Sequence, residues 1–282
     1  MPPALSGAEI RVMAVEDRPD HPFEKARFAL KVCAMSFLHS LLRRSASPAG
    51  KSEATQPFRL NGETVDILVR RHDRAVRIKL SVDAAKGMPV LTLPRHVSDR
   101  EGQVFVEKNA GWLRSAMARV PDAVPLSHGS IVPVRGTDTR IDHRPDGRGV
   151  TRIDGDALIV TGDAAHTARR VTDFLKRQAR ADLTAGVREK AAILGRTAGR
   201  ITVRDTRTRW GSCAANGDLS FSWRLILTPP EILDYVVSHE VAHLVHMDHS
   251  PAFWRTVARL DPDYEDHRDW LYRNGSALHR IG

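Results

Sequence analysis

The segment TPPEILDYVVSHEVAH, Thr228–His243, decides the fold of the C-terminal part of this chain. Its opening Thr-Pro-Pro-Glu predicts the start of a helix. Threonine can cap a first turn, proline is accommodated at the first helical position, and a glutamate three residues after the cap completes a capping box. Because the residues that follow are mostly apolar, we expect a buried helix that carries His239-Glu-Val-Ala-His243 in its last turns.

Two histidines and a glutamate within this HExxH segment predict a metal site. His239 and His243 are four residues apart, so on a helix their side chains share one face, about 6 Å apart along the axis. Both imidazoles can reach one ion, and Glu240 beside them can take a proton from a metal-bound water. The apolar flanks strengthen this interpretation, because buried ionisable groups need a partner. The alternative is a helix with surface histidines, in a chain that has 13 of them.

The third ligand is less well defined by spacing. His246 lies seven residues after His239, about 10 Å along a continued helix, which is too far for both to bind one ion. His249 precedes a Ser-Pro pair that should start a new helix, and the turn required there can bring it back to the metal. We therefore favour His249. The remaining candidates are Asp263 and Glu265, since a glutamate on the following helix is a common zinc ligand.

The spacing of His239, His243 and His249 equals that of the metzincin proteases, but two other features of that class are missing. The glycine in the middle of the metzincin motif is replaced by His246, and no methionine follows Met247 to form a Met-turn. We therefore do not assign the chain to that class.

The N-terminal half reads as short strands interrupted by helices. Apolar and polar residues alternate from Val76 to Val82, the period of a half-buried strand. The other expected elements are a strand at 89–93, a helix through Leu113 opened by Ser98 and Glu101, strands at 131–134 and 157–160, and a helix at about 165–194 that stops at Gly195. This part is expected to be β-rich.

The C-terminal half is expected to be mainly helical. Residues 200–204 should be extended, Asn216-Gly217 should form a tight turn, and a return strand should run over 219–227. Three helices should begin near Pro229, Pro251 and Tyr264. The fold class expected is α+β, with residues 1–60 as an N-terminal extension, 61–195 as a β-rich region with two helices, and 196–282 as the catalytic core.

Composition places weak bounds on partners and location. The net charge of +9 and the pI near 10.0 favour an anionic partner, with nucleic acid one such partner. Cys33 and Cys213 form no disulfide framework, which is typical of a protein of the reducing cytoplasm. The longest apolar stretch, Phe28–Leu42, is too short and too polar to span a membrane.

Four segments give the chain a family resemblance. They are Arg209-Trp-Gly-Ser-Cys213, Trp223-Arg-Leu-Ile226, Asp234–Leu244 and His249-Ser-Pro-Ala-Phe-Trp254. Together they resemble the YgjP-like metallopeptidase domain, a relative of the SprT-like and WLM proteases. The resemblance is strongest over residues 207–275 and weaker back to about residue 65. It implies a zincin-like core, a small sheet packed against the active-site helix.

The same resemblance implies roles for individual residues. One Zn²⁺ would be held by His239, His243 and His249, with Glu240 as the general base. Trp210, Gly211 and Ser212 belong to a family signature and are candidates for substrate binding, because a strand edge beside the site can pair with an extended peptide. Packing of Trp210 and a turn at Gly211 explain the signature equally well.

These observations favour a zinc-dependent hydrolase, and specifically a metallopeptidase acting on proteins or peptides. A zinc-activated water can also attack a phosphoanhydride, and the preceding arginines could hold a nucleotide; they are Arg200, Arg204, Arg207 and Arg209. The SprT-like relatives suggest a protease recruited to DNA. A structural zinc module is the non-enzymatic alternative, and it would need four protein ligands.

Overall fold

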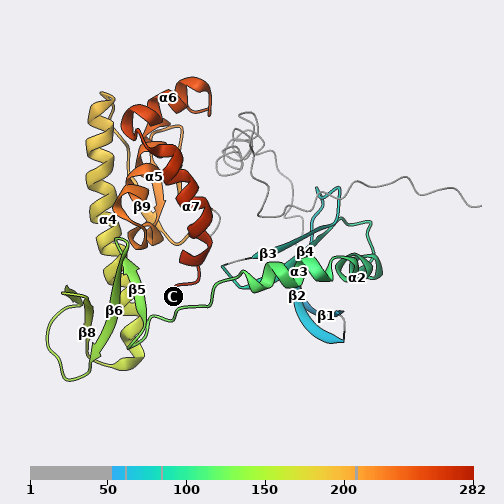
Figure 1. Ribbon diagram of the computed structural model, residues 1–282. Helices are drawn as coiled ribbons and strands as arrows, with labels where there is room; N and C mark the ends of the chain where they lie inside the picture. Colours follow the sequence, from blue (N-terminus) through green and yellow to red (C-terminus); the bar gives the residue numbers. More distant parts are fainter. Residues whose placement is uncertain (1–52, 61, 84, 207–208) are drawn as a thin grey trace, which may run out of the picture.

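Three small sheets and the helices that follow them make up the computed structural model, which describes residues 53–60, 62–83, 85–206 and 209–282 (Figure 1). The strands are β1 Glu53–Leu60, β2 Glu63–Arg71, β3 Lys79–Asp83, β4 Met88–Leu93, β5 Ile131–Val134, β6 Thr137–Arg144, β7 Arg152–Asp154, β8 Ala157–Thr161, β9 Ile201–Arg204, β10 Gly211–Cys213 and β11 Leu219–Ser222. The α-helices are α2 Asp99–Lys108, α3 Ala110–Ala118, α4 Thr167–Ile193, α5 Pro230–Ala242, α6 Pro251–Leu260 and α7 Tyr264–Leu278, and the 3-10 helices are η1 Ala164–His166 and η2 Trp223–Leu227. The expected α+β class is confirmed.

The first sheet has the order β1-β2-β4-β3. β1 and β2 form an antiparallel hairpin, β2 and β4 run parallel, and β3 is antiparallel to β4. β1 lies within the range that we expected to be an extension. Its only buried side chains are Phe58 and Leu60, so its sequence carries little strand signal. Residues 53–60 therefore belong to the folded part of the chain, and the rest of the expected extension lies outside the described residues.

The second sheet repeats the topology of the first. Its order is β5-β6-β8-β7, with an antiparallel β5–β6 pair, a parallel β6–β8 pair and an antiparallel β7–β8 pair. Each sheet is followed along the chain by helix, α2 and α3 after the first and α4 after the second. The two units share strand order and direction rather than residues, so the repeat is one of topology.

Two expected N-terminal elements differ in their bounds. The strand expected from Val76 begins at Lys79, and Val76 itself is 83% exposed, so alternation alone did not mark its start. The helix expected to run from Ser98 through Leu113 is two helices that meet at Asn109. Ser98 and Glu101 do form the expected capping box, and the Asn109 side-chain amide donates to the carbonyl of Phe105 at 2.7 Å, closing α2.

Helix α4 is the long helix that the sequence predicts, and it packs on β8, β9, η2 and α5 (Figure 1). It ends as expected at Gly195, whose φ of 61° is the left-handed conformation that favours glycine. The N–H of Gly195 donates to Ala192 and that of Arg196 to Ala191, which satisfies carbonyls of the last turn.

The return strand and the helix start at Thr228 differ from expectation. The strand expected over 219–227 ends at Ser222, and a fully buried 3-10 turn, η2, follows it. Thr228 does not cap α5, because its hydroxyl donates instead to the carbonyl of Leu225 at 2.8 Å. The N-cap is Pro229, with no side-chain capping bond, and Pro230 takes the first helical position. The expected helix starts near Pro229, Pro251 and Tyr264 are confirmed.

Two hydrophobic clusters suggest how the chain divides. One contains buried residues between Phe58 and Leu113, and the other contains buried residues between Leu126 and Ile281. The boundary that we expected at 195/196 falls inside the second cluster, where α4 packs against α5. We therefore propose a division near residues 119–123. Val124, just after this segment, forms an isolated parallel β-bridge with Ile281.

No helix of the described ranges is both long and apolar enough to cross a membrane. The apolar stretch Phe28–Leu42, which we expected not to span a bilayer, lies outside those ranges.

Candidate metal centre

The three predicted histidines come together at the end of α5. His239 lies in the last helical turn, and His243 is the C-cap with φ −67° and ψ −16°, so helical geometry continues through it. His249 arrives from the loop that follows. The ring centroids are 5.2 Å apart for His239–His243, 5.2 Å for His239–His249 and 4.9 Å for His243–His249. One ligand nitrogen from each ring lies within 4.8 Å of the others.

The chain turn that returns His249 has an identifiable cause. The N–H groups of Val245 and His246 both donate to the carbonyl of Ala242, which ends α5 tightly. Ser250 then caps α6 by accepting from the N–H of Phe253, with Pro251 in the first turn, as the sequence predicts. His249 is therefore held between a helix end and a helix start, both close to the same point.

Phe253 is a residue of the site that sequence reasoning missed. Its ring is fully buried and lies 5.0 Å from His239, 4.5 Å from His243 and 4.7 Å from His249, centroid to centroid. It packs against all three imidazoles and restricts their rotation. Its place one turn into α6, after the Ser-Pro start, was the available signal.

Hydrogen bonding orients the imidazoles toward a common point. Nδ1 of His243 lies 2.9 Å from the carbonyl oxygen of His246, so this nitrogen carries the proton and Nε2 is the nitrogen that can bind a metal. Nε2 of His249 and Nε2 of His239 are 3.3 Å apart. Two nitrogens each at about 2.05 Å from a tetrahedral zinc ion are about 3.3 Å apart. The pair is spaced as two ligands of one ion would be.

The other candidate ligands take no part in this cluster. His246 contributes its backbone carbonyl, and its ring is not among the three that converge. Glu265 accepts a hydrogen bond from the hydroxyl of Tyr264 at 3.1 Å, and Asp263 is exposed at the start of α7. Within the described residues, the group that can hold a metal is the three histidines.

Burial keeps the three imidazoles neutral near pH 7. Desolvation lowers the pKa of His239 well below its usual value, and it also lowers the pKa of His243. The half-buried His249 has its pKa lowered to about 4, first by desolvation and then by the charge of His243. Neutral imidazole is the form that binds metal.

Glu240 is buried behind the cluster, with 2% of its surface exposed. Desolvation raises its pKa to about 8, against the lowering effects of the Arg209 charge and of a hydrogen bond from the backbone N–H of Cys213. Its Oε2 atom has no hydrogen-bond partner among the described residues. Unpartnered buried polar atoms are costly, so they indicate groups that a bound species completes.

Gly211 explains how Glu240 comes to face a strand. A Cβ at residue 211 would lie 2.5 Å from Oε1 and 2.6 Å from Cγ of Glu240, closer than real contacts allow. Gly211 does not have a positive φ, so its backbone conformation does not require glycine. The close approach of β10 to Glu240 on α5 does require it. This contact was not foreseen from the sequence.

The other two signature residues lie differently. Trp210 stacks on His279, with ring centroids 4.7 Å apart, and its indole would touch a Cβ at Gly275, so it packs on α7. Ser212 lies in β10 opposite Ser220. β10 is an edge strand, in a sheet of order β10-β11-β9. The signature thus combines packing by Trp210 with a backbone edge beside Glu240.

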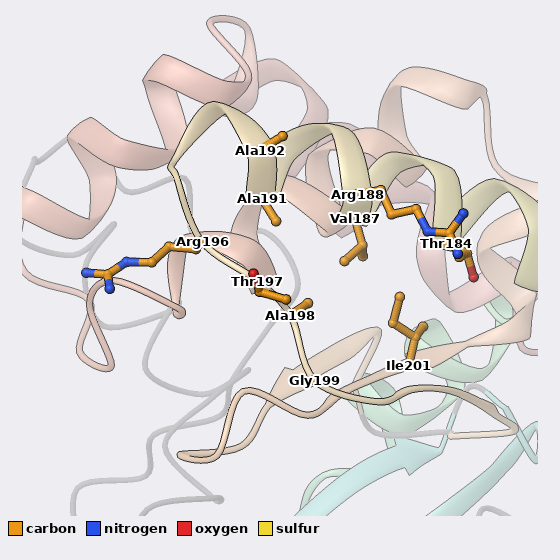
Figure 2. Close-up of a pocket in the computed structure, with 10 residues that line it drawn as sticks. All are labelled: Thr184, Val187, Arg188, Ala191, Ala192, Arg196, Thr197, Ala198, Gly199 and Ile201. Atoms are coloured by element: carbon orange, nitrogen blue, oxygen red, sulfur yellow. The ribbon is translucent and has the colours of Figure 1, made fainter.

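A cavity of about 520 Å³ lies elsewhere, between α4 and the segment before β9. In Figure 2, the side chains of Val187 and Ala191 point across it toward Ala198 and Ile201. Its lining contains two arginines, Arg188 and Arg196, but no imidazole and no carboxylate. This cavity therefore offers none of the side chains that a metal centre needs.

The arginines expected to hold a nucleotide do not form one group. Arg200 pairs with Asp218 at 3.3 Å, and Arg204 is exposed on β9. Arg209 lies near enough to Glu240 for its charge to lower the pKa of that carboxyl, and Arg207 is outside the described residues.

Comparison with known proteins places this geometry in context. Residues 76–274 match the family model of the YgjP-like metallopeptidase domain. Among solved structures, the metallopeptidase zymogen abylysin of Pyrococcus abyssi is similar at 20% sequence identity and a TM-score of 0.31, over 33% of this chain and 93% of that one. No curated protein matches the chain.

Proposed function

Because this chain belongs to the YgjP-like metallopeptidase domain family, we propose that it is a zinc-dependent peptidase whose ion is bound by His239, His243 and His249. The family implies a metal ion and protein or peptide substrates. The convergence of three buried or half-buried imidazoles beside a buried carboxylate is the observation that supports the site.

The donor set fits zinc in its catalytic form. Imidazole nitrogen is a preferred ligand of Zn²⁺, and catalytic sites use three protein ligands with the fourth position open. A structural site would be closed by a fourth protein ligand, and within the described residues the cluster has three members. This favours a catalytic site over a structural zinc module.

Glu240 is the group placed to move protons. When bound, zinc supplies the Lewis acidity that makes a water nucleophilic and polarises a peptide carbonyl. Glu240 accepts the proton of the attacking water at its unpartnered Oε2 and returns it to the leaving amine. Burial raises its pKa to about 8 in the metal-free chain, and the positive charge of a bound ion would lower that pKa and leave the carboxylate ready to accept the proton.

We infer that an extended peptide pairs with the outer edge of β10. The carbonyl of Trp210 accepts from Ser222, and the N–H of Ala214 donates to Asp218, so these residues face β11. In an antiparallel pair the next residues along face the other way, which directs the backbone of Gly211 outward. The strand edge would place a scissile bond beside Glu240, as in β-augmentation.

Two substitutions test the site. Glu240→Gln should keep one zinc per chain and lose turnover by at least about 10²-fold, because it removes the proton acceptor but no ligand. His243→Ala should lose both zinc and activity. Zinc is measured by elemental analysis, and activity by cleavage of an unfolded protein substrate.

His246→Ala is the matched control for the ligand set. It removes an imidazole from the same loop but keeps the carbonyl that orients His243, so zinc content should stay at one per chain. Turnover that survives in both Glu240→Gln and His243→Ala would rule out the mechanism.

A further inference from the structure

An aromatic wall extends from the metal centre onto α7. The ring centroid of Trp254 lies 5.8 Å from that of His239 and 5.9 Å from that of His249. The ring of Tyr264 stacks on that of Trp254, with a centroid distance of 5.4 Å and an interplanar angle of 24°. The wall, defined as Trp254 and Tyr264, therefore joins two of the proposed ligands to the first turn of α7.

Arg268 lies over this wall. Its guanidinium carbon is 5.6 Å from the ring centroid of Trp254 and 6.0 Å from that of Tyr264. The side chain is half-buried and forms no ion pair with any residue that the structure describes. Nearby carboxylates are engaged elsewhere: Asp261 binds His267 at 2.9 Å, and Glu265 binds the Tyr264 hydroxyl.

The charge of Arg268 acts on the metal centre. Its guanidinium lies over Trp254, whose ring packs on His239 and His249, so the charge is held beside these two proposed ligands. A fixed positive charge beside a cation site weakens cation binding. Such a charge is useful if negative charge appears there during the reaction.

We propose that Arg268 is a catalytic residue that donates to the oxygen of the scissile carbonyl as this oxygen gains negative charge. The inference rests on the proposed peptidase function. The guanidinium lies beside the rings of Trp254 and Tyr264 and forms no ion pair with a described residue, so its N–H groups can donate to an oxygen. Since the charge on that oxygen grows toward the transition state, the contact lowers the barrier more than it strengthens substrate binding.

The kinetic test compares Arg268→Gln and Arg268→Lys with Arg273→Gln, an exposed arginine on the same helix. Arg268→Gln should lower kcat by about 10²-fold, the loss typical for one oxyanion donor, with KM changed less than about threefold. Arg268→Lys keeps the charge and should recover part of the loss. Arg273→Gln should behave as the wild type.

A binding test does not depend on turnover. The probe is a peptide phosphinate with a blocked C-terminus, whose tetrahedral anionic centre resembles the transition state. Calorimetry on the zinc-loaded proteins should show about tenfold or greater weakening for Arg268→Gln, and no change for Arg273→Gln. Zinc affinity, measured against a competing chelator, should be unchanged or tighter in Arg268→Gln, because a like charge has been removed.

Several results would overturn the inference. Equal phosphinate affinity in the wild type and Arg268→Gln is one. A loss confined to KM, seen with free-acid peptides but not with amidated ones, is another, since it would assign Arg268 to a substrate carboxylate. Zinc loss in Arg268→Gln and Arg268→Lys alike would make the residue structural. If the wild type binds zinc but cleaves nothing, the peptidase proposal fails, and the phosphinate comparison still decides the role of Arg268.

Discussion

At the scale of the residue, the most demanding contact is between Gly211 and Glu240. The strand carries no side chain at the point where the carboxylate lies, and a methyl group there would sit within 2.5 Å of an oxygen. The glycine of the signature therefore fixes the position of the proposed general base. It does so by steric exclusion, independently of any contact with substrate.

Gly211→Ala should keep zinc and lower kcat/KM by at least about tenfold, because Glu240 must move away from the attacking water. The displacement should also cost about 1–3 kcal/mol in the free energy of unfolding, as overpacking of a buried site does. Gly111→Ala in α3 is the control, since a Cβ there meets nothing within 4 Å. If Gly211→Ala has the kcat/KM of the wild type, β10 can move away from α5 without displacing Glu240, and the prediction is wrong.

Glu240 also makes a pH prediction for the protein stripped of metal. Its pKa is about 8 when folded and near 4.5 in an unfolded chain, so the folded state binds the proton more tightly. Stability from this group is full below pH 4.5 and is lost as pH rises to 8. The free energy of unfolding of the wild type, relative to Glu240→Gln, should fall by roughly 3 kcal/mol between pH 6 and pH 9.

Urea unfolding of the two proteins at both pH values measures this change. Taking the difference removes the effect of the three histidines, whose lowered pKa values act below pH 6.5 and in the opposite direction. Glu231→Gln, a substitution at the exposed start of the same helix, keeps Glu240 and should therefore retain the wild-type fall in stability between pH 6 and pH 9. A difference that does not vary with pH would contradict the burial of an ionisable carboxyl at residue 240.

At the scale of the element, helix ends determine the site. α5 ends at Ala242 and α6 starts at Pro251. The eight residues between them turn the chain so that His249 lies beside His239 and His243. The Ser-Pro start of α6 and the glycine end of α4 were readable from the sequence, because caps are local. The 3-10 turn of η2 was not, because its buried run Trp223–Leu227, apolar except for Arg224, is equally consistent with a strand.

At the scale of the whole molecule, the two hydrophobic clusters place the proposed site within one of them. All three histidines, Glu240 and β10 lie in the part that follows residue 119, together with the strand bridge that binds the chain end. A fragment of residues 120–282 should therefore fold cooperatively and bind one zinc. Circular dichroism melting and elemental analysis check this, with residues 53–282 as the control. A fragment that stays unfolded while the control folds would show that the two units form one cooperative structure.

The sequence by itself determined the α+β class, the helix carrying His239, Glu240 and His243, and the helix starts after it. These depend on caps, periodicity and residues four apart, which are properties of neighbouring residues. Only the tertiary structure decided which ring joins the pair, which backbone touches Glu240 and where Arg268 lies. Those residues are between 6 and 29 positions from the ones they serve, and tertiary packing rather than local spacing brings them together. Phe253 packs on His249, Trp254 lies under Arg268, and β10 packs on α5.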